Sequence, residues 1–273
     1  MLGTLYDFLT KPTEVKEAYD YLPFHGAILP IIIVNVFFVV FAFRLGPWLM
    51  RNREPFNLKR VLIAYNVCQI IYNGIMTILG VILLSEYIAD FGGISCIRHW
   101  GIDHPMKKFE IFCGLLYLSN KFIDYLETLF FILRKSYKQV TVLHVYHHIM
   151  MTTFIYLHTV SQGLGGHGST IAILNAFVHV VMYVYYLLSS IDPERKKSLW
   201  WKKYITQMQL AQFVVDFIHQ SWPLVVMRDC PVSKIWQIIA VTQAVVMMWM
   251  FGNFYYKTYI RKPKDKKETG KQS

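Results

Sequence analysis

The sequence has little charge for its length. Of 273 residues, 16% are charged and 55% are hydrophobic, whereas soluble domains have about 25% charged and about 45–50% apolar residues. This composition argues against a water-soluble enzyme and against a disordered protein. The remaining charge is unequal, with 28 Lys and Arg against 17 Asp and Glu, a net charge of +11. In a membrane protein such an excess belongs to cytoplasmic loops, so we expect a lipid bilayer and no nucleic acid as a partner.

Cysteine is scarce as well. Four cysteines are too few for a disulfide scaffold, and no C-x-x-C pair suggests zinc or redox chemistry. A cleavable signal peptide is not expected, because residues 1–23 are mixed and acidic. Such a peptide would instead place a basic stub before an apolar run.

Long apolar stretches are what the sequence does contain. A hydrocarbon core about 30 Å thick needs about 20 apolar residues in a helix. Seven stretches meet this need: 26–43, 61–84, 111–133, 140–160, 170–190, 204–226 and 235–256. The sequence therefore predicts an all-α membrane protein with seven transmembrane helices. It divides into an N-terminal lumenal segment (1–25), a helical domain (26–256) and a basic cytosolic tail (257–273).

The distribution of Lys and Arg predicts the orientation. The connections after the first, third and fifth stretches, with the tail, hold 20 of these residues, and the N-terminal segment with the other connections holds 7. By the positive-inside rule the N-terminus is lumenal and the C-terminus cytosolic. Cys96 and Cys230 then both lie on the lumenal side, where disulfides can form. We expect a bridge between them.

Four of the seven stretches carry polar residues at helical spacing. An ionisable side chain at the centre of a transmembrane helix costs about 2.5–3.5 kcal/mol, so it needs a partner or a function. The four sets are Lys121, Asp124, Glu127 and Thr128; His144, His147 and His148; Asn175, His179, Met182 and Tyr186; and Gln209, Gln212, Asp216 and His219. Each set follows one helix face.

Lipid cannot satisfy these polar faces, so we expect them to meet around a polar pocket. The first stretch has no such face and is expected at the periphery, outside a closed bundle of the other six. Structural alternatives remain open for three sets. Lys121 and Asp124 can form a simple ion pair, tyrosines such as Tyr186 can belong to the core or to an interfacial belt, and the glutamines can hold helices together.

The H-x-x-H-H spacing of His144, His147 and His148 is the most specific signal in the sequence. Clustered histidines can bind a metal or perform acid–base and nucleophilic chemistry. A di-iron membrane desaturase or hydroxylase needs several histidine boxes, and the other histidines form no second cluster. That class is the alternative prediction, and no metal is expected. A seven-span receptor or transporter would not explain the histidine triplet.

These motifs carry a family resemblance. LHVYHH is preceded by KFIDYLETLFFILRK and followed by NAFVHVVMYVYY and TQMQLAQF. In this order the four motifs resemble the ELO family, the fatty-acid elongase condensing enzymes of the endoplasmic reticulum membrane. The resemblance covers about Leu58 to Tyr256. The family's usual K-x-x-E-x-x-D-T pattern differs here, because Asp124 and Glu127 exchange the two acids.

The resemblance implies a reaction without a cofactor. Malonyl-CoA loses carbon dioxide, and the resulting carbanion attacks a long-chain acyl group to give a 3-ketoacyl-CoA. A histidine is the expected nucleophile, because Cys113 has no recognisable base partner. We predict an acyl-imidazole on His147, with His144 and His148 orienting it or holding protons. His179 would activate malonyl-CoA or stabilise its enolate.

The remaining roles are substrate binding. The expected residues in the helices are Lys121, Asp124, Glu127, Asn175, Tyr186, Gln209 and Gln212, with Asn175 and Tyr186 donating hydrogen bonds to the developing oxyanion. Arg134, Lys202 and Arg261 are expected at the CoA phosphates, with a role as positive-inside anchors alone as the alternative. Phe154, Met182, Phe213, Met247 and Trp249 are candidates for the lining of an acyl tunnel, although each by itself is more typical of ordinary packing. The family also implies a ketoacyl reductase, a dehydratase and an enoyl reductase as partners. A homo- or hetero-oligomer is left open.

Overall fold

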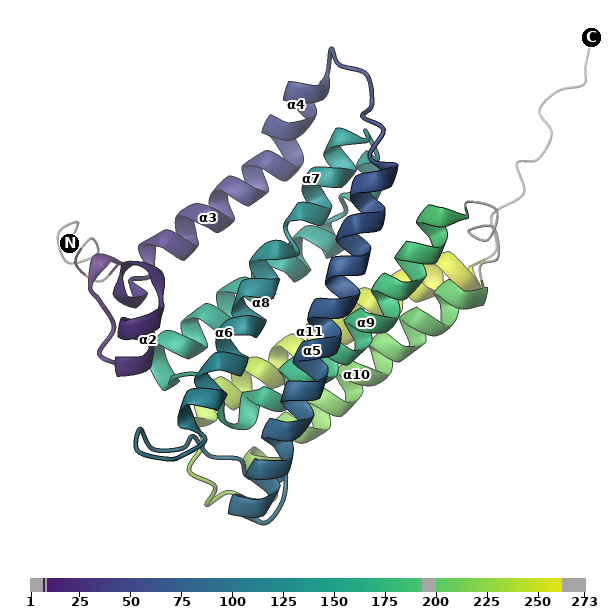
Figure 1. The fold of residues 1–273 in the computed structure, drawn as a ribbon. Helices are drawn as coiled ribbons and strands as arrows, with labels where there is room; N and C mark the ends of the chain where they lie inside the picture. Colours follow the sequence, from purple (N-terminus) through teal and green to yellow (C-terminus); the bar gives the residue numbers. More distant parts are fainter. Residues whose placement is uncertain (1–6, 8, 193–199, 262–273) are drawn as a thin grey trace, which may run out of the picture.

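The computed structural model describes residue 7, residues 9–192 and residues 200–261. Within these ranges every regular element is helical (Figure 1). The predicted all-α class is therefore confirmed.

Helices cover all seven of the predicted apolar stretches. A short helix, α2 (Lys16–Tyr21), and a 3₁₀ turn, η1 (Pro23–Gly26), come before them. The first stretch is continuous through α3 (Leu29–Val40), the π-helical η2 (Phe41–Leu45) and α4 (Gly46–Met50). The later helices are α5 (Lys59–Phe91), α6 (Lys107–Ile123), α7 (Leu126–Leu133), α8 (Val142–Gln162), α9 (Ser169–Ile191), α10 (Trp200–Val225) and α11 (Lys234–Tyr255), which the π-helical η6 (Tyr256–Ile260) extends.

The third stretch differs from the single helix expected over 111–133, because a break separates α6 from α7. Across the break the amides bond three residues back instead of four: Glu127 N to Asp124 O at 3.1 Å and Thr128 N to Tyr125 O at 3.1 Å. Such i→i+3 bonds wind the chain more tightly, as in a 3₁₀ turn. No proline or glycine marks this position in the sequence.

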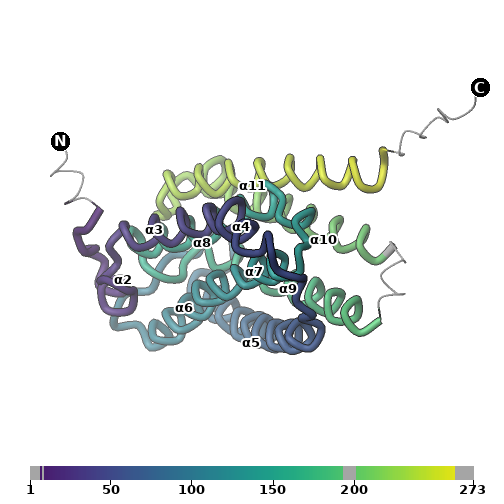
Figure 2. Tube along the Cα trace, turned by 90° about the horizontal axis from the view of Figure 1, so that it is seen from above, coloured from purple at the N-terminus to yellow at the C-terminus, as the bar shows by residue number. Residues whose placement is uncertain are grey.

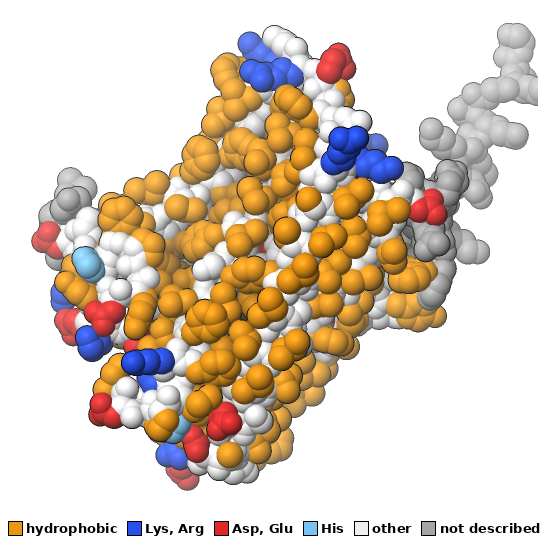
Figure 3. Space-filling model, in the orientation of Figure 1, with side chains coloured by type: hydrophobic (Ala, Val, Ile, Leu, Met, Phe, Trp, Pro, Cys, Tyr) orange, Lys and Arg blue, Asp and Glu red, His pale blue; other side chains and the backbone are white. Residues whose placement is uncertain are grey.

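Four helical segments are long and apolar enough to cross a membrane: Leu29–Met50, Lys59–Phe91, Gly166–Ile191 and Lys234–Ile260. The other three, α6 with α7, α8 and α10, carry polar faces, and the break shortens α6 to 17 residues. Figure 3 shows hydrophobic side chains covering the flank of the molecule, with charged groups gathered towards its ends. These features are those of a multi-pass membrane protein.

Six of the helices pack in a closed ring. In order around it, α5 contacts α6, α6 contacts α8, α8 contacts α11, α11 contacts α10, α10 contacts α9 and α9 returns to α5 (Figures 1 and 2). Helix α3 packs on the outside of α8, and α4 packs on α7. The outward side chains of α3, such as Ile33, Val36 and Phe37, are exposed. The first apolar stretch is thus peripheral to the ring.

One end of the ring is fastened by covalent and ionic links. A disulfide joins Cys96, before α6, to Cys230, before α11. Nearby, the buried Lys107 Nζ lies 2.7 Å from Glu17 Oε1 and 2.7 Å from Glu110 Oε2. Glu17 Oε2 also accepts the amide of Leu164 at 3.0 Å. These links hold α2, α6 and the connection between α8 and α9 together.

Candidate active site

Helix α8 presents the histidine triplet in its first two turns. Thr141 caps the helix, because its side-chain oxygen accepts the amide of His144 at 3.2 Å. A threonine in this position satisfies a free amide of the first turn. The cap fixes where the helix begins and therefore which face carries the histidines.

These histidines line a cavity of about 690 Å³ inside the ring, hereafter the large cavity, and a smaller cavity also lies among the described helices. His179 of α9 lines it too, so the four predicted catalytic histidines converge from two helices. The same cavity is lined by seven of the predicted substrate-binding residues: Glu127, Arg134, Asn175, Tyr186, Lys202, Gln209 and Gln212.

Lys121 and Asp124 do not line the large cavity but lie buried behind its wall, each with 2% or less of its surface exposed. Lys121 Nζ is 3.0 Å from Asp124 Oδ2 and donates to Asn175 Oδ1 at 2.9 Å. Asn175 Oδ1 also accepts the hydroxyl of Tyr117 at 3.2 Å. With its oxygen held by two donors, the Asn175 side chain keeps its amide nitrogen as the remaining hydrogen-bond donor.

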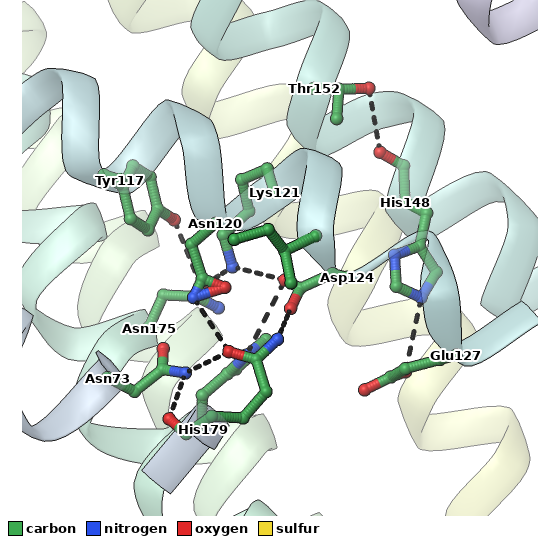
Figure 4. A network of polar contacts seen from close by, with 12 residues as sticks. Asn73, Tyr117, Asn120, Lys121, Asp124, Glu127, His148, Thr152, Asn175 and His179 are labelled. Atoms are coloured by element: carbon green, nitrogen blue, oxygen red, sulfur yellow. Dashed lines mark hydrogen bonds and ion pairs between the residues drawn. The ribbon is translucent and has the colours of Figure 1, made fainter. Parts of the chain in front are cut away.

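Asp124 lies at the centre of a polar network that connects three helices (Figure 4). Its Oδ1 accepts Gln69 Nε2 of α5 at 2.8 Å and the Tyr183 hydroxyl of α9 at 3.0 Å. Its Oδ2 faces Nδ1 of His179 at 3.9 Å. A carboxylate beside one ring nitrogen favours the tautomer with the proton on that nitrogen. The other nitrogen, Nε2, is then an acceptor.

Glu127 places a carboxylate beside the histidine triplet, as Asp124 does beside His179. Its Oε2 lies 3.6 Å from His148 Nε2, and its Oε1 accepts the Tyr183 hydroxyl at 2.5 Å. Figure 4 shows Glu127 directed towards the His148 ring. His144 Nε2 pairs with Thr128 Oγ1 at 2.8 Å. Among the described residues, no hydrogen bond or ion pair engages the ring of His147. The central histidine is thus the one whose ring is left for a ligand.

Some predicted residues lie elsewhere. Asp216 accepts Gln212 Nε2 at 3.3 Å, and His219 stacks on His167 with ring centroids 4.1 Å apart; neither lines the large cavity. Arg261 is exposed and is not among the lining residues of the described chain.

The residues expected along the acyl tunnel also lie in different parts of the structure. Met182 and Phe213 line the large cavity, Phe154 lines the smaller one and Met247 is buried. Trp249 is 70% exposed. The prediction for Trp249 is wrong, because its side chain lies on the outer surface of α11.

Sequence reasoning missed a fifth polar face, on α5. Asn66, Gln69, Asn73 and Thr77 follow the same helical spacing as the other four sets. Gln69 bonds to Asp124, and its Oε1 accepts Asn120 Nδ2 at 3.2 Å. The signal was present in the sequence, but amides without charge stand out less than Lys, Asp or His.

Asn35 of the peripheral α3 was also undervalued. It accepts the Tyr125 hydroxyl at 2.5 Å and donates to Thr153 Oγ1 at 2.7 Å. Phe38, one turn further along α3, stacks on Tyr125 with ring centroids 3.9 Å apart. The peripheral helix therefore contacts the α6–α7 break that carries Tyr125.

A metal is possible at one place in the described chain. The ligand atoms of Glu127, His144 and His148 lie within 4.8 Å of one another. Two histidines and a carboxylate can hold a single divalent cation. Di-iron sites in helical bundles draw on more side chains from four helices, so this set alone does not fit two irons.

Comparison with known proteins extends these observations. The GNS1/SUR4 family, also called ELO, matches residues 23–267. Very long chain fatty acid elongase F of Drosophila melanogaster is 42% identical over 224 residues, which cover 82% of this chain and 86% of that protein. Very long chain fatty acid elongase 4 of Mus musculus is 37% identical over 245 residues, covering 89% of this chain and 75% of that protein. The chain therefore belongs to the ELO (GNS1/SUR4) family.

Proposed function

We propose that this protein is a very-long-chain fatty acid elongase, a 3-ketoacyl-CoA synthase that condenses malonyl-CoA with a long-chain acyl-CoA. Family membership and the names of the relatives support the reaction class. The single observation that carries the proposal is the convergence of His144, His147, His148 and His179 from two helices on one cavity. This chain supplies the parts for acyl transfer from its own side chains.

The first step is acyl transfer to His147. Its imidazole nitrogen attacks the thioester carbonyl, a carbon–nitrogen bond forms, the carbon–sulfur bond breaks, and the ring proton goes to the departing CoA thiolate. The unpaired ring of His147 supports this role, because a nucleophile must be free to approach its substrate. His144 and His148 are held by Thr128 and Glu127, and the His148 ring lies 5.5 Å from that of His147.

The second step is decarboxylative condensation. Malonyl-CoA loses carbon dioxide, and the electron pair left behind attacks the acyl-imidazole carbon. A carbon–carbon bond forms, the carbon–nitrogen bond to His147 breaks, and the released ring takes up a proton from solvent. With Nδ1 facing Asp124, His179 has Nε2 available to bind malonyl-CoA and to hold its enolate in place. The Asn175 amide, whose oxygen is held by Lys121 and Tyr117, is positioned to donate to the developing oxyanion. Tyr186 is the second predicted donor.

The entrance to the large cavity supports binding of CoA. Arg134 and Lys202 line it, as do Lys59 and Lys138, which the sequence analysis did not select. Guanidinium and ammonium groups are suited to phosphates. A site for the CoA phosphates here requires this end of the bundle to face the cytosol, in agreement with the distribution of Lys and Arg.

The topology follows from the same orientation. In the proposed arrangement the chain crosses the endoplasmic reticulum membrane seven times. It has a lumenal segment over 1–25, a helical domain over 26–256 and a cytosolic tail over 257–273. The acyl tunnel lies inside the six-helix ring of the helical domain. Of the tail, residues 262–273 lie outside the described residues. Epitope tags at the two ends, probed after selective permeabilisation, test it; tags on one side contradict seven crossings.

The reaction itself is tested with purified protein, radiolabelled malonyl-CoA and a panel of long-chain acyl-CoAs. We expect labelled 3-ketoacyl-CoA only when both substrates are present. His147→Ala should abolish both product and the covalently trapped acyl group, whereas His25→Ala, outside the cavity, should leave both unchanged. Full activity of His147→Ala contradicts the mechanism. Stoichiometric iron required for activity would instead support the desaturase or hydroxylase alternative.

The product defines the class of partner. A 3-ketoacyl-CoA must be reduced, dehydrated and reduced again before another two carbons can be added. A ketoacyl reductase, a dehydratase and an enoyl reductase are therefore the proposed partners. Co-purification of these activities with the tagged protein tests the association.

A further inference from the structure

Helix α3 lies outside the ring and carries one polar side chain, that of Asn35. This side chain is 8% exposed, and lipid offers it no hydrogen bond, so it needs partners in the protein. Its Nδ2 donates to Thr153 Oγ1 of α8 at 2.7 Å, and its Oδ1 accepts the Tyr125 hydroxyl at 2.5 Å. The bond to Thr153 joins two helices, as amides often do in membranes. The bond to Tyr125 instead reaches the break between α6 and α7.

Tyr125, inside this break, is held by both α3 and α8. Its hydroxyl also pairs with Thr152 Oγ1 at 2.6 Å, and its ring stacks on Phe38 with centroids 3.9 Å apart. Thr152 in turn bonds to the backbone carbonyl of His148 at 3.1 Å, a bond drawn in Figure 4. A stacked ring and a hydroxyl with two partners leave the side chain of Tyr125 little freedom.

The break carries the two acids that face the histidines. Asp124 precedes Tyr125, and Glu127 follows it by two residues. Asp124 Oδ2 lies 3.9 Å from His179 Nδ1. Glu127 Oε2 lies 3.6 Å from His148 Nε2. The i→i+3 bonds of the break have poorer geometry than those of an α-helix, and no proline or glycine marks it in the sequence. The positions of both acids therefore depend on the contacts that hold the break.

His148 also contacts these aromatic residues directly. Its ring meets the ring of Tyr125 edge to face with centroids 6.0 Å apart, and that of Phe38 with centroids 6.1 Å apart. Aromatic rings prefer such arrangements at centroid distances of about 4.5–7 Å. Asn35, Phe38 and Tyr125 are not among the residues that line the large cavity. The three side chains thus support His148 from outside the space where a substrate would bind.

We propose that Asn35 is a positioning residue, which holds the α6–α7 break through Tyr125 and so keeps Asp124 and Glu127 beside their histidines. This inference rests on the proposed elongase function and adds a helix outside the ring to the catalytic unit. A displacement of about 1 Å caused by a change far from the chemistry can cost about 100-fold in rate. Because Asn35 does not line the large cavity, its loss should lower kcat and leave KM nearly unchanged.

Three variants separate positioning from helix packing. Asn35→Leu has a similar size and removes both hydrogen bonds of the amide. Tyr125→Phe keeps the ring on Phe38 and removes only the hydroxyl. Thr153→Ala removes the bond that joins Asn35 to α8 and keeps the bond from Tyr125. We expect Asn35→Leu and Tyr125→Phe each to lower kcat about tenfold or more, and Thr153→Ala to have nearly the wild-type kcat.

The double variant of Asn35→Leu and Tyr125→Phe tests the link between the two residues. Its kcat should be no lower than that of the slower single variant, because both changes break one link. The values of kcat and KM are measured on purified protein that thermal unfolding in detergent shows to be folded. Val36→Leu, at an exposed position of the same helix, is the matched control and should keep the wild-type kcat.

Three results would overturn the inference: a wild-type kcat in Asn35→Leu, an equal fall of kcat in Thr153→Ala, or fully multiplied losses in the double variant. If Asn35→Leu does not fold, Tyr125→Phe decides by the same measurement, and a wild-type kcat there overturns the inference. Absence of condensation by the wild type with every acyl-CoA would contradict the proposed function instead.

Discussion

The carboxylate of Asp124 lies 3.9 Å from Nδ1 of His179, and no described residue forms a hydrogen bond with that buried nitrogen. The two side chains belong to different stretches of the sequence, 55 residues apart by their numbers. Asp124 is itself fixed by Lys121, Gln69 and Tyr183. We therefore propose Asp124 as a positioning residue that acts on the proposed reaction through His179.

Replacing Asp124 by Asn tests this positioning role. The amide can present its oxygen or its nitrogen to His179, so the proton position on the ring is no longer fixed. We expect kcat to fall about 10- to 100-fold, a typical loss when the orienting partner of a functional histidine is removed. The pH profile of kcat should also move, whereas a purely structural role would lower the yield of folded protein and leave the profile of the remainder unchanged. Asp90→Asn, on the α5 end outside the network, is the control.

Tyr183 links the two acids, because its hydroxyl bonds both to Asp124 at 3.0 Å and to Glu127 at 2.5 Å. Tyr183→Phe should destabilise the protein by about 1.5–3 kcal/mol, the range for a hydrogen bond to a charged group. Thermal unfolding in detergent measures the loss, with Tyr137→Phe, which is exposed, as the control. Glu127→Gln should add less in the Tyr183→Phe background than alone, because both changes act on one network. Strict additivity would show that the shared hydroxyl does not couple the acids.

The sequence was sufficient to predict the helices and the polar interior, because hydrocarbon imposes simple rules. An apolar stretch long enough to cross must be helical, and polar faces such as that of His144, His147 and His148 must meet inside. The same rules identify the peripheral position of α3, which carries mostly apolar side chains.

Other features depend on contacts between distant residues. The 3₁₀ turn at Asp124 and Tyr125 has no local signal, and its side chains bond to Gln69 of α5 and Asn35 of α3. Trp249 was misplaced because the apolar residues of α11 are not confined to one side of the helix, so their spacing does not show which side faces inward.

The buried cation at the closed end of the ring should be important for stability. Lys107 contacts both Glu17 and Glu110 at 2.7 Å and is 2% exposed. Lys107→Ala leaves two carboxylates without their cation, and breaking a buried ion pair in this way costs about 3–5 kcal/mol. Lys16→Ala, which removes the exposed pair with Asp20 at 2.9 Å, should cost much less, because water screens an exposed ion pair. Thermal unfolding of both variants makes the comparison, and equal losses would contradict the ionic role of Lys107.

Stability should also fall on mild acidification, through His99 in the connection between α5 and α6. Burial lowers the pKa of His99 below its ordinary value, an effect larger than the opposing effect of Glu110. Its ring pairs through Nδ1 with the carbonyl of Leu164 at 3.3 Å and stacks on His158. In the unfolded chain the same ring titrates near 6.5.

Below that pH the unfolded state therefore takes up a proton that the folded state does not. The free energy of unfolding that is present above pH 6.5 is then lost as the pH falls. For this single group the loss is at most about 1.4 kcal/mol per pH unit. The melting temperature should drop between pH 7 and pH 5, and His99→Gln should make the drop smaller, while His25→Gln should not change it. A drop of the same size in the His99→Gln protein would assign the acid sensitivity to other groups.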